Sequence, residues 1–401
     1  MDVVAGRHSA RSIVLSRLRG RMIRVMTERI SRFLAEHSPE TPCLVIDLDV
    51  IEKAYEALSW YFPLARIYYA VKANPAAEIV AKLKGRGASF DVASRGEIEL
   101  CLANGVAPDR LSFGNTIKKE KDIAFAHQSG LRMFAFDSAH ELDKLARAAP
   151  GARVFCRILV TCEGADWPLS RKFGCAPEMA IDLLRKARDL GLDPYGVSFH
   201  VGSQQTDLGQ WDGAVGAAAR TFSLLAEADI NLRMINLGGG FPAHYRGEVP
   251  EIDLYAQAVM AAITRYFGND LPEIIIEPGR SLVGDAGVIQ SEVVLISEKG
   301  GGDVRRWVYL DVGKFNGLAE TMDESIKYRI LTPGRRGSSG PVVLAGPTCD
   351  SADILYEQTE YRLPLGLEIG DKIEILSTGA YTASYASVGF NGFSPIRTYC
   401  I

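Results

Sequence analysis

The stretch Ile235-Asn-Leu-Gly-Gly-Gly240 decides between the two folds that the rest of the chain allows. A short apolar run ends here in three glycines, which are too few for a Walker loop and lack the GxGxxG spacing of a dinucleotide site. In an open doubly wound sheet such a fingerprint follows the first strand. These glycines instead follow the seventh of eight similar runs, which favours a closed barrel.

The eight runs are short, rich in β-branched and aromatic residues, and each is followed by a segment that can be helical. Eight such units are the number that closes a TIM (β/α)8 barrel, an α/β fold. The runs are Ile67–Ala73, Ala88–Ser94, Arg110–Asn115, Met133–Asp137, Val154–Val160, Gly196–Ser203, Ile235–Gly240 and Glu273–Pro278.

The pattern changes after Arg280 to short alternating segments between glycine-rich turns, such as Val288–Ile296 and Lys372–Leu376. This pattern predicts a β domain. Residues 41–49 are expected to connect that domain to the first barrel strand. We therefore expect an N-terminal extension over 1–40 that is partly associated with the β domain, a barrel over 41–280, and a C-terminal β domain over 281–401.

The 401 residues include 45 Lys and Arg against 49 Asp and Glu, a net charge of −4 that argues against a nucleic-acid binder. The seven cysteines lack CxxC or zinc-type spacing, so neither a disulfide framework nor a metal site is expected. No apolar stretch approaches the roughly 18 to 20 residues of a membrane span. We expect a soluble cytoplasmic protein that acts on a small molecule.

The segment up to Glu36 is rich in arginine but has no continuous apolar core of signal-peptide length. We interpret it as a solvated extension, or as the product of a start site placed too early, with Met22 or Met26 as the true start. A targeting role is the less favoured interpretation.

In a TIM barrel the catalytic residues lie at the carboxyl ends of the strands. A polar residue or a glycine stands near that end of every predicted strand here. One alone would be explained as a solvated strand end, a helix cap or a satisfied core histidine, but eight together indicate a functional site. They are Lys72, Asp91, Asn115, Asp137, Arg157, His200, Gly238–Gly240, and Glu277 with Arg280.

The loops after the last two predicted strands indicate a phosphate site, because barrels commonly bind phosphate there. Gly238–Gly240 would supply backbone N–H groups and Arg280 a guanidinium. Lys72 across the rim can form an imine, so the ligand can be a phosphate-bearing aldehyde cofactor. Pyridoxal 5′-phosphate meets both requirements, and Glu277 is placed to keep its ring nitrogen protonated.

Seven segments, in order along the chain, resemble those of the fold-III pyridoxal-phosphate amino-acid decarboxylases of the ornithine decarboxylase group. The resemblance implies an alanine racemase-like TIM barrel joined to a C-terminal β domain. It also implies a head-to-tail homodimer with both active sites at the subunit interface. The segments are Tyr69-Ala-Val-Lys-Ala-Asn-Pro75, Phe90-Asp-Val-Ala-Ser94, Ser198-Phe-His-Val-Gly-Ser203, Gly238-Gly-Gly-Phe-Pro242, Glu277-Pro-Gly-Arg280, Gly346-Pro-Thr-Cys-Asp350 and Gly379-Ala-Tyr-Thr382.

The resemblance also implies roles for the matching residues. Lys72 would be the Schiff-base lysine, His200 would stack on the cofactor ring, and Glu277 would pair with the pyridine nitrogen. Cys349 would reach the other subunit's site and protonate the carbanion left after CO₂ departs, and Asp350 would contact the distal amine of the substrate. The phosphate would lie among Ser203, Gly238, Gly239, Gly240, Arg280 and Tyr381, with Gly279, Asp91 and Arg157 as further cofactor-binding residues.

In that family a second acid binds the distal ammonium of the substrate. The matching region of this chain contains three acids, Glu320, Asp323 and Glu324. We favour Asp323. The expected substrates are ornithine, lysine or both, giving putrescine or cadaverine in polyamine biosynthesis. Arginine stays an alternative, because the length of the substrate pocket cannot be read from the sequence.

Three other interpretations share part of this pattern. Diaminopimelate decarboxylase shares the lysine and glycine signals, but its substrate carries a distal carboxylate that needs a cation, whereas Asp350 favours a distal amine. An inactive regulatory homologue is disfavoured because four residues occur together: Lys72, Glu277, Arg280 and Cys349. An amino-acid racemase would use a β-domain tyrosine as a second base, whereas the setting of Tyr381 resembles the decarboxylases.

Overall fold

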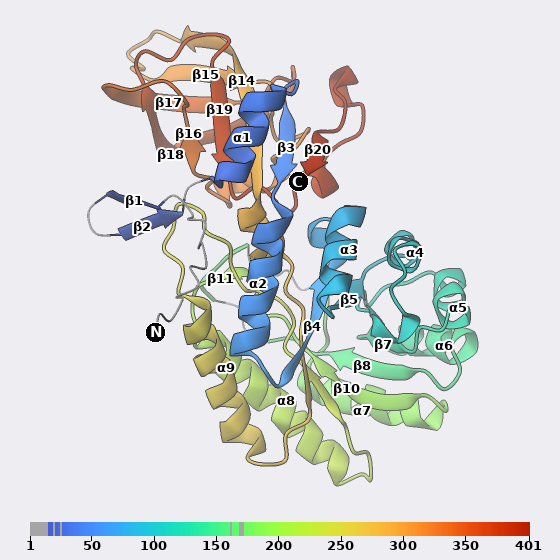
Figure 1. Cartoon of the computed structure of the whole chain (residues 1–401). Helices are drawn as coiled ribbons and strands as arrows, with labels where there is room; N and C mark the ends of the chain where they lie inside the picture. The colour runs from blue at the N-terminus through green and yellow to red at the C-terminus, as the bar shows by residue number, and fades with distance from the viewer. Residues whose placement is uncertain (1–14, 19–20, 25, 161–162, 168–171) are drawn as a thin grey trace, which may run out of the picture.

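The computed structural model of the chain describes residues 15–18, 21–24, 26–160, 163–167 and 172–401. The first 14 residues, on which much of the interpretation of the arginine-rich start rests, lie outside the described residues. Figure 1 shows a barrel surrounded by helices in its lower half and a second domain of β-strands above it.

Eight parallel strands close into a barrel in which chain neighbours are also sheet neighbours, and the last strand pairs with the first. Each strand overlaps one of the eight predicted runs, so the predicted barrel is confirmed. The strands are β4 (Ala65–Ala70), β5 (Ser89–Val92), β6 (Leu111–Phe113), β7 (Met133–Phe136), β8 (Arg153–Arg157), β10 (Asp193–Ser198), β12 (Met234–Asn236) and β13 (Glu273–Ile276).

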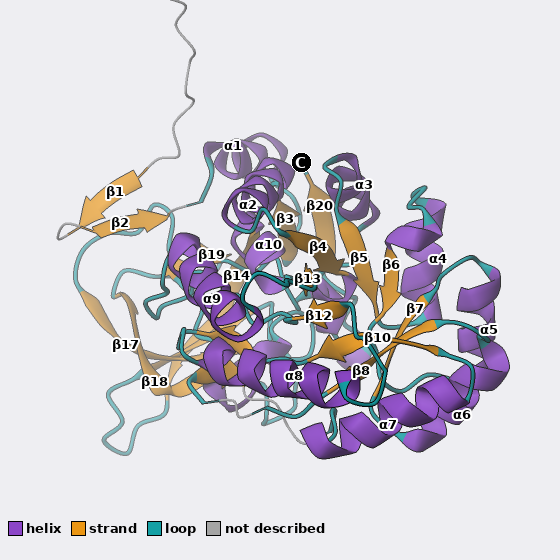
Figure 2. Ribbon diagram, turned by 90° about the horizontal axis from the view of Figure 1, so that it is seen from below, coloured by secondary structure: helices purple, strands orange, loops and turns teal. Residues whose placement is uncertain are grey.

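Helices surround the barrel on its outer face (Figure 2). Side-chain caps fix where several of them begin: the Ser94 hydroxyl accepts the Glu97 N–H, and the Glu97 carboxylate accepts the Ala93 N–H. The helices are α2 (Leu48–Tyr61), α3 (Ala77–Gly85), α4 (Arg95–Ala103), α5 (Glu120–Gln128), α6 (Ala139–Ala148), α7 (Pro177–Asp189), α8 (Gln210–Ala226), α9 (Ile252–Phe267) and the short α10 (Arg280–Val283).

The alternation of side chains along the strands separates two apolar layers. In β4, Ile67 and Tyr69 belong to the large cluster that includes the helices, whereas Tyr68 belongs to a second cluster with residues such as Phe155 and Ile275. Successive side chains of a strand point to opposite faces, so the second cluster fills the barrel interior. The interior is therefore packed, and ligands must bind at the rim.

The second domain is a mixed sheet of eight strands. Its strand β3 pairs antiparallel with β14 and parallel with β20, so the chain leaves this sheet directly before α2 leads into the barrel. The strands are β3 (Cys43–Ile46), β14 (Gly287–Glu298), β15 (Arg306–Leu310), β16 (Ile330–Leu331), β17 (Ser339–Ala345), β18 (Ile354–Pro364), β19 (Lys372–Leu376) and β20 (Arg397–Cys400).

Helix α1 (Glu28–His37) lies on this sheet because Ile30 and Leu34, four residues apart on one helix face, pack against Val45 and Val288. Two small antiparallel pairs complete the structure: β1 (Leu15–Leu18) with β2 (Arg21–Arg24), and β9 (Ala165–Trp167) with β11 (Ser203–Gln205).

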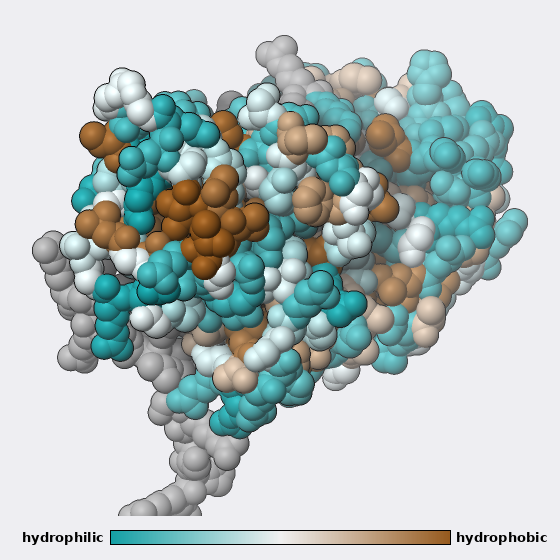
Figure 3. Space-filling view, turned by 90° about the horizontal axis from the view of Figure 1, so that it is seen from above, coloured by the Kyte–Doolittle hydropathy of each residue, from teal (hydrophilic) through white to brown (hydrophobic). Residues whose placement is uncertain are grey.

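Apolar side chains also gather on the surface of the β domain (Figure 3). Exposed large apolar residues of this domain include Val294, Leu295, Leu365 and Ile369. Among the described residues, no helix combines the length and the hydrophobicity that crossing a membrane requires.

Candidate active site

The polar residues predicted for the catalytic rim lie where the barrel strands end. Lys72 belongs to the 3-10 turn η1 (Val71–Ala73) that directly follows β4, and His200 follows β10 by two residues. Parallel strands of a closed barrel end at the same face, so these side chains meet there. The others are Asp91 within β5, Arg157 at the end of β8, Gly238–Gly240 after β12 and Glu277 after β13.

Two of the predicted rim residues, Asn115 and Asp137, make hydrogen bonds to backbone groups of the barrel loops. The Asn115 side-chain amide donates to the Ala93 carbonyl at 3.2 Å, and the Asp137 carboxylate accepts the Gly174 N–H at 2.8 Å. Their polarity is explained by these backbone contacts, as expected for residues that order barrel loops.

Lys72 presents an accessible amine beside a buried carboxylate. Its Nζ lies 3.4 Å from Asp91 Oδ2, and the two side chains are 48% and 4% exposed. Burial alone would lower the pKa of Lys72, but the negative charge of Asp91, with further contributions from Tyr381 and Glu277, raises it above its usual value. Arg157 opposes this effect. The amine is therefore protonated at neutral pH, yet open to a ligand.

Glu277 is held by a residue of the neighbouring strand. Asn236, the last residue of β12, donates from its side-chain amide to Glu277 Oε1 at 2.5 Å and accepts the Gly238 N–H at 2.9 Å. Burial, followed by the charge of Asp91, raises the pKa of Glu277 from 4.5 to about 7. A cation placed beside this carboxyl would favour its ionised form.

His200 is neutral in this environment. Burial, together with the positive charges of Arg157 and Lys72, holds the pKa of His200 well below its usual value of 6.5. Its Nδ1 accepts the Gly202 N–H at 3.0 Å, which fixes the proton on Nε2. An uncharged imidazole is suited to stacking against a flat ring.

The glycine loop is shaped by close backbone contacts that exclude other residues. A Cβ on Gly238 would collide with the Phe199 carbonyl oxygen, and one on Gly240 would lie 2.7 Å from the Gly202 carbonyl oxygen. Both glycines have positive φ angles, 66° and 103°. This conformation and this crowding require glycine, and they leave a backbone loop that can approach a ligand closely.

Arg280 lies deep in the same region and forms a two-point ion pair. Its Nη1 and Nη2 lie 2.6 and 2.5 Å from the two Glu320 oxygens, with side chains 4% and 5% exposed. Nη1 also donates to the Tyr245 hydroxyl, and the guanidinium carbon stands 4.8 Å above the Tyr381 ring. The buried Nε of Arg280 has no hydrogen-bond partner among the described residues, so one donor of the guanidinium is left without an acceptor.

The family model "pyridoxal-dependent decarboxylase, pyridoxal binding domain" matches residues 48–284, more than half of the chain. The chain belongs to this family.

Relatives and solved structures agree with that assignment. The chain is 35% identical over 370 residues to the lysine/ornithine decarboxylase of Selenomonas ruminantium, covering 92% of this chain and 91% of that protein. It is similar to the crystal structure of the Vibrio vulnificus lysine/ornithine decarboxylase complexed with cadaverine (TM-score 0.84, 30% identity, 94% and 100% coverage). It is also similar to the Paramecium bursaria Chlorella virus arginine decarboxylase bound to agmatine (TM-score 0.85, 26% identity, 93% and 99% coverage).

The residues at the rim fit the pyridoxal phosphate cofactor of this family of decarboxylases. Lys72 offers an accessible amine, Glu277 a half-buried carboxyl whose pKa a cationic ring would lower, and Arg280 a buried donor without a partner among the described residues. An unsatisfied buried donor is costly unless a ligand accepts from it. A phosphate oxygen supplies that acceptor.

The remaining predicted cofactor residues lie around the same loops. Gly279 begins the turn into α10, and a Cβ there would lie 3.0 Å from the Ala73 Cβ and 3.4 Å from the Tyr381 hydroxyl. Tyr381 has a φ of 54° and donates its N–H to the Ala73 carbonyl at 2.8 Å. These contacts join β4, β13 and the β domain behind Lys72. Ser203 opens β11, half-buried, three residues beyond His200.

The two predicted residues Cys349 and Asp350 lie on the β domain after β17. The Cys349 N–H and Sγ both lie close to Asn391 Oδ1, at 3.1 and 3.4 Å, and the cysteine is exposed. Asp350 is also exposed and accepts the Ala352 N–H at 2.9 Å. Both side chains are therefore presented on the outer surface of the protomer.

The three acids that the sequence leaves as alternatives have different surroundings in the 3-10 segment η4 (Ala319–Glu324). Glu320 pairs with Arg280. Glu324 accepts the backbone N–H groups of residues 357–359 on β18 at 2.6 to 2.7 Å. Asp323 is exposed and makes no hydrogen bond or ion pair within the part of the chain that the structure describes. Of the three, Asp323 has its carboxylate available to a substrate.

The sequence did not single out three residues that complete the site. Asn236 orients Glu277, Tyr245 orients Arg280, and Gly114 leaves room for Asp91, whose carboxylate would collide with a Cβ at position 114. Asn236 had a detectable signal, since it is a polar residue inside the run that leads into Gly238. Tyr245 had none, because its contact spans 35 residues of chain.

Proposed function

We propose that this protein decarboxylates L-ornithine, L-lysine or both, giving putrescine or cadaverine, with pyridoxal phosphate bound to Lys72. The observation that carries the proposal is the accessible Lys72 amine at the rim, beside the buried Asp91 carboxyl and within the field of Glu277. The names of the Selenomonas and Vibrio relatives support the substrate class.

The residues of the rim would bind and orient the cofactor. Lys72 would hold it covalently, His200 would cover one face of the ring as a neutral imidazole, and Glu277 would keep the ring nitrogen protonated. When bound, pyridoxal phosphate supplies a conjugated cationic ring that accepts the electron pair released as CO₂ leaves. Asp91 and Arg157 would balance the charges around the lysine.

The phosphate would be bound by backbone and side-chain donors together. Gly238–Gly240 offer backbone N–H groups in a loop that only glycine can form, and Arg280 offers its unpartnered Nε–H. Tyr381, Ser203 and Gly279 complete the set. Because Glu320 neutralises Arg280, orientation of donors rather than net charge would hold the phosphate.

The substrate would be bound at both ends by residues of two protomers. Asp323 would pair with the distal ammonium of ornithine or lysine, joined by Asp350 from the other protomer. Cys349 of that other protomer would deliver its thiol proton to the α-carbon after CO₂ leaves. The exposed position of Cys349 and Asp350 on the β domain supports this sharing of sites.

This arrangement requires a homodimer, which we propose together with a cytoplasmic location and a role in polyamine biosynthesis. Exposed apolar side chains near Asn391, including Tyr385, Val388 and Phe390, support an interface on this side of the β domain.

A competition assay tests the proposed reaction. Purified protein with pyridoxal phosphate receives ornithine, lysine, arginine and diaminopimelate together, and the amines are separated and quantified. We expect putrescine, cadaverine or both. Agmatine alone would instead favour arginine, the substrate class suggested by the Chlorella virus relative. If the diaminopimelate is isotopically labelled, labelled lysine would favour that decarboxylase.

The same assay with Lys72→Arg separates catalysis from folding. Arginine keeps the positive charge beside Asp91 but cannot form the imine at neutral pH, so we expect no diamine and no absorbance band of lysine-bound cofactor. A variant that still releases diamines at the wild-type rate would refute the assignment of Lys72. Failure of the wild-type protein to bind the cofactor would support the inactive regulatory homologue.

A further inference from the structure

Three chain segments that would hold the cofactor phosphate lead into one hydrogen-bonded cluster. His244 follows the glycine loop, Asp285 follows Arg280 through α10, and Ser377 precedes Tyr381; each lies within five residues of its phosphate-binding neighbour. We call these three residues, His244, Asp285 and Ser377, the clasp.

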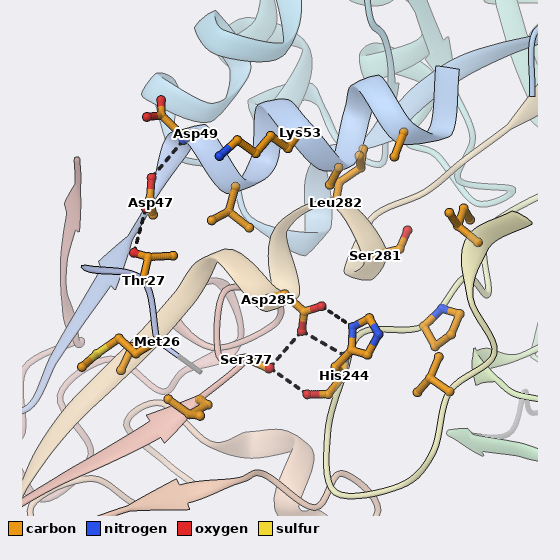
Figure 4. A pocket seen from close by; sticks show the side chains of 18 of the residues that line it. Met26, Thr27, Asp47, Asp49, Lys53, His244, Ser281, Leu282, Asp285 and Ser377 are labelled. Carbon is orange, nitrogen blue, oxygen red and sulfur yellow. Dashed lines mark hydrogen bonds and ion pairs between the residues drawn. The ribbon is translucent and has the colours of Figure 1, made fainter. Parts of the chain in front are cut away.

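Direct hydrogen bonds connect all three members of the clasp (Figure 4). Asp285 accepts the His244 N–H at 3.0 Å through Oδ1 and faces His244 Nδ1 at 2.5 Å through Oδ2. The Ser377 hydroxyl lies 2.9 Å from Asp285 Oδ1 and 2.8 Å from the His244 carbonyl oxygen. The barrel loop, the turn after α10 and the β domain are thereby tied together at one carboxylate.

The carboxylate at the centre of the clasp stays ionised. Burial alone would raise the pKa of Asp285, but the hydrogen bonds and charge of His244, with the Ser377 hydroxyl, lower it to about 2. Bonds to an ionised acceptor are about twice as strong as neutral ones. The hydrogen bonds of the clasp therefore reinforce the relative positions of the three segments.

The backbone at Ser377 also needs such support. Its φ of 60° lies in the left-handed region, which costs a non-glycine residue free energy. Besides its contacts within the clasp, its hydroxyl accepts a hydrogen bond from Arg329 Nη2 at 3.1 Å. Four residues later Tyr381 repeats the unusual conformation with a φ of 54°, so the side-chain hydrogen bonds of Ser377 act together with the backbone hydrogen bond from Tyr381 to Ala73 to fix the course of this segment.

On one side the clasp faces a cavity of about 630 Å³ between α2, α9, α10 and the β domain. Figure 4 shows His244, Asp285 and Ser377 at the wall of this cavity. The side chains of His244 and Asp285 are 30% and 17% exposed. Close packing fixes the neighbouring residues Ala243, Ala286 and Leu376, which are buried, and on the cavity side the hydrogen bonds of the clasp add to this packing.

We propose that His244, Asp285 and Ser377 are positioning residues for the cofactor phosphate, because their mutual hydrogen bonds hold the glycine loop, Arg280 and Tyr381 in one arrangement. This inference rests on the proposed function, since it requires pyridoxal phosphate to bind at those three groups. It assigns a role in cofactor affinity to residues that would not touch the cofactor.

The test compares pyridoxal phosphate with pyridoxal, which has the same aldehyde and ring but no phosphate. Wild-type protein freed of cofactor, Asp285→Asn and Ser377→Ala are each titrated with both ligands by the absorbance of the lysine-bound form. We expect the Kd of pyridoxal phosphate to rise about tenfold or more in both variants, as when one hydrogen bond to a charged group is lost. The Kd of pyridoxal should stay within about twofold.

Ser281→Ala is the matched control. Ser281 lines the same cavity on α10, but its buried hydroxyl has no hydrogen-bond partner among the described residues. Its removal should leave the Kd values of both ligands unchanged. If Asp285→Asn does not fold, as judged by circular dichroism, Ser377→Ala decides, because it removes only one hydroxyl group.

Two results would overturn the inference while leaving the proposed function intact. One is a wild-type Kd for pyridoxal phosphate in folded Ser377→Ala. The other is an equal loss of affinity for both ligands, which would indicate general loosening rather than positioning of the phosphate site. Failure of the wild-type protein to bind either ligand would instead refute the proposed function itself.

Discussion

The carboxyl of Glu277 lies in the field of a second carboxyl, Asp91, and of two cations, Lys72 and Arg157. Burial and the charge of Asp91 outweigh the effect of the two cations and raise the pKa of Glu277 to about 7. A carboxyl in this state is prepared for a ligand that brings a further positive charge. The protonated ring of pyridoxal phosphate is such a ligand.

This shift in the pKa of Glu277 predicts how pH changes the stability of the cofactor-free protein. A carboxyl whose folded pKa is raised binds its proton more tightly when folded, so its contribution is favourable at low pH and is lost between about pH 4.5 and 7. Glutamine does not ionise, so Glu277→Gln does not lose this stability. As the pH is raised from 5 to 8, we expect the free energy of unfolding of the variant to gain on the order of 1 to 3 kcal/mol relative to wild type.

Denaturant unfolding of both cofactor-free proteins at the two pH values measures the effect. Glu298→Gln, at an exposed acid on β14, gives the background for loss of a surface carboxylate. A stability difference between Glu277→Gln and wild type that does not change with pH would refute the assignment of this pKa.

At the scale of elements, the segment η4 places three neighbouring acids in three different environments. Glu320 is buried against Arg280, Glu324 anchors the segment to the backbone of β18, and Asp323 is exposed. The three acids have different surroundings because Met322 and Asp323 depart from helical backbone angles, so the acidic side chains point in different directions.

We expect Glu320→Gln to destabilise the cofactor-free protein by about 3 to 5 kcal/mol, because it leaves Arg280 as a buried charge without a counter-ion. Added pyridoxal phosphate should restore part of this loss, since its phosphate supplies negative charge. Tyr245→Phe removes only a hydroxyl from the same guanidinium and should cost about 1 kcal/mol. Equal losses in the two variants, measured by urea unfolding, would contradict this view of the pair.

We expect Asp323→Asn to raise the KM for ornithine and lysine about 10- to 100-fold, the value of one hydrogen bond to a charged group. The Kd of pyridoxal phosphate should not change, because Asp323 makes no hydrogen bond or ion pair with the described residues that would hold the phosphate. Glu324→Gln instead loosens the anchor to β18 and should lower the unfolding midpoint. If steady-state kinetics show an unchanged KM for Asp323→Asn, Asp323 does not bind the distal ammonium, and Glu320 and Glu324 are again the candidates.

At the scale of the whole molecule, the proposed cofactor-binding lysine and the proposed proton donor lie on different domains of one protomer. Lys72 lies at the barrel rim, whereas Cys349 is exposed on the β domain and contacts Asn391. A head-to-tail pair of protomers would bring Cys349 of one to the Lys72 rim of the other.

Mixing two inactive variants tests this sharing. Lys72→Arg and Cys349→Ser protomers, dissociated and reassociated together, should form mixed dimers with one complete site each and recover about a quarter of wild-type activity. Each variant reassociated alone is the control. A mixture that forms dimers of the expected mass but stays inactive would place both residues in the same protomer's site.

The sequence determined the barrel and most of its rim because both depend on local chemistry. Runs such as Ile67–Ala73 are apolar because they are buried on both faces, and each one marks the strand and therefore the end at which Lys72 or Glu277 stands. The glycines at 238–240 are likewise readable, since positive φ angles and backbone contacts require them. Once the strands are located, closure of the barrel gathers their ends without further information.

Only the tertiary structure decided which polar groups meet across long stretches of chain. Glu320 and Arg280 are 40 residues apart, and nothing local distinguishes Glu320 from Asp323 or Glu324 as the partner of that guanidinium. The clasp residue Ser377 meets His244 across 133 residues. Such contacts are set by how the β domain is seated on the barrel, a sum of many weak packing terms that leaves no pattern at any single position.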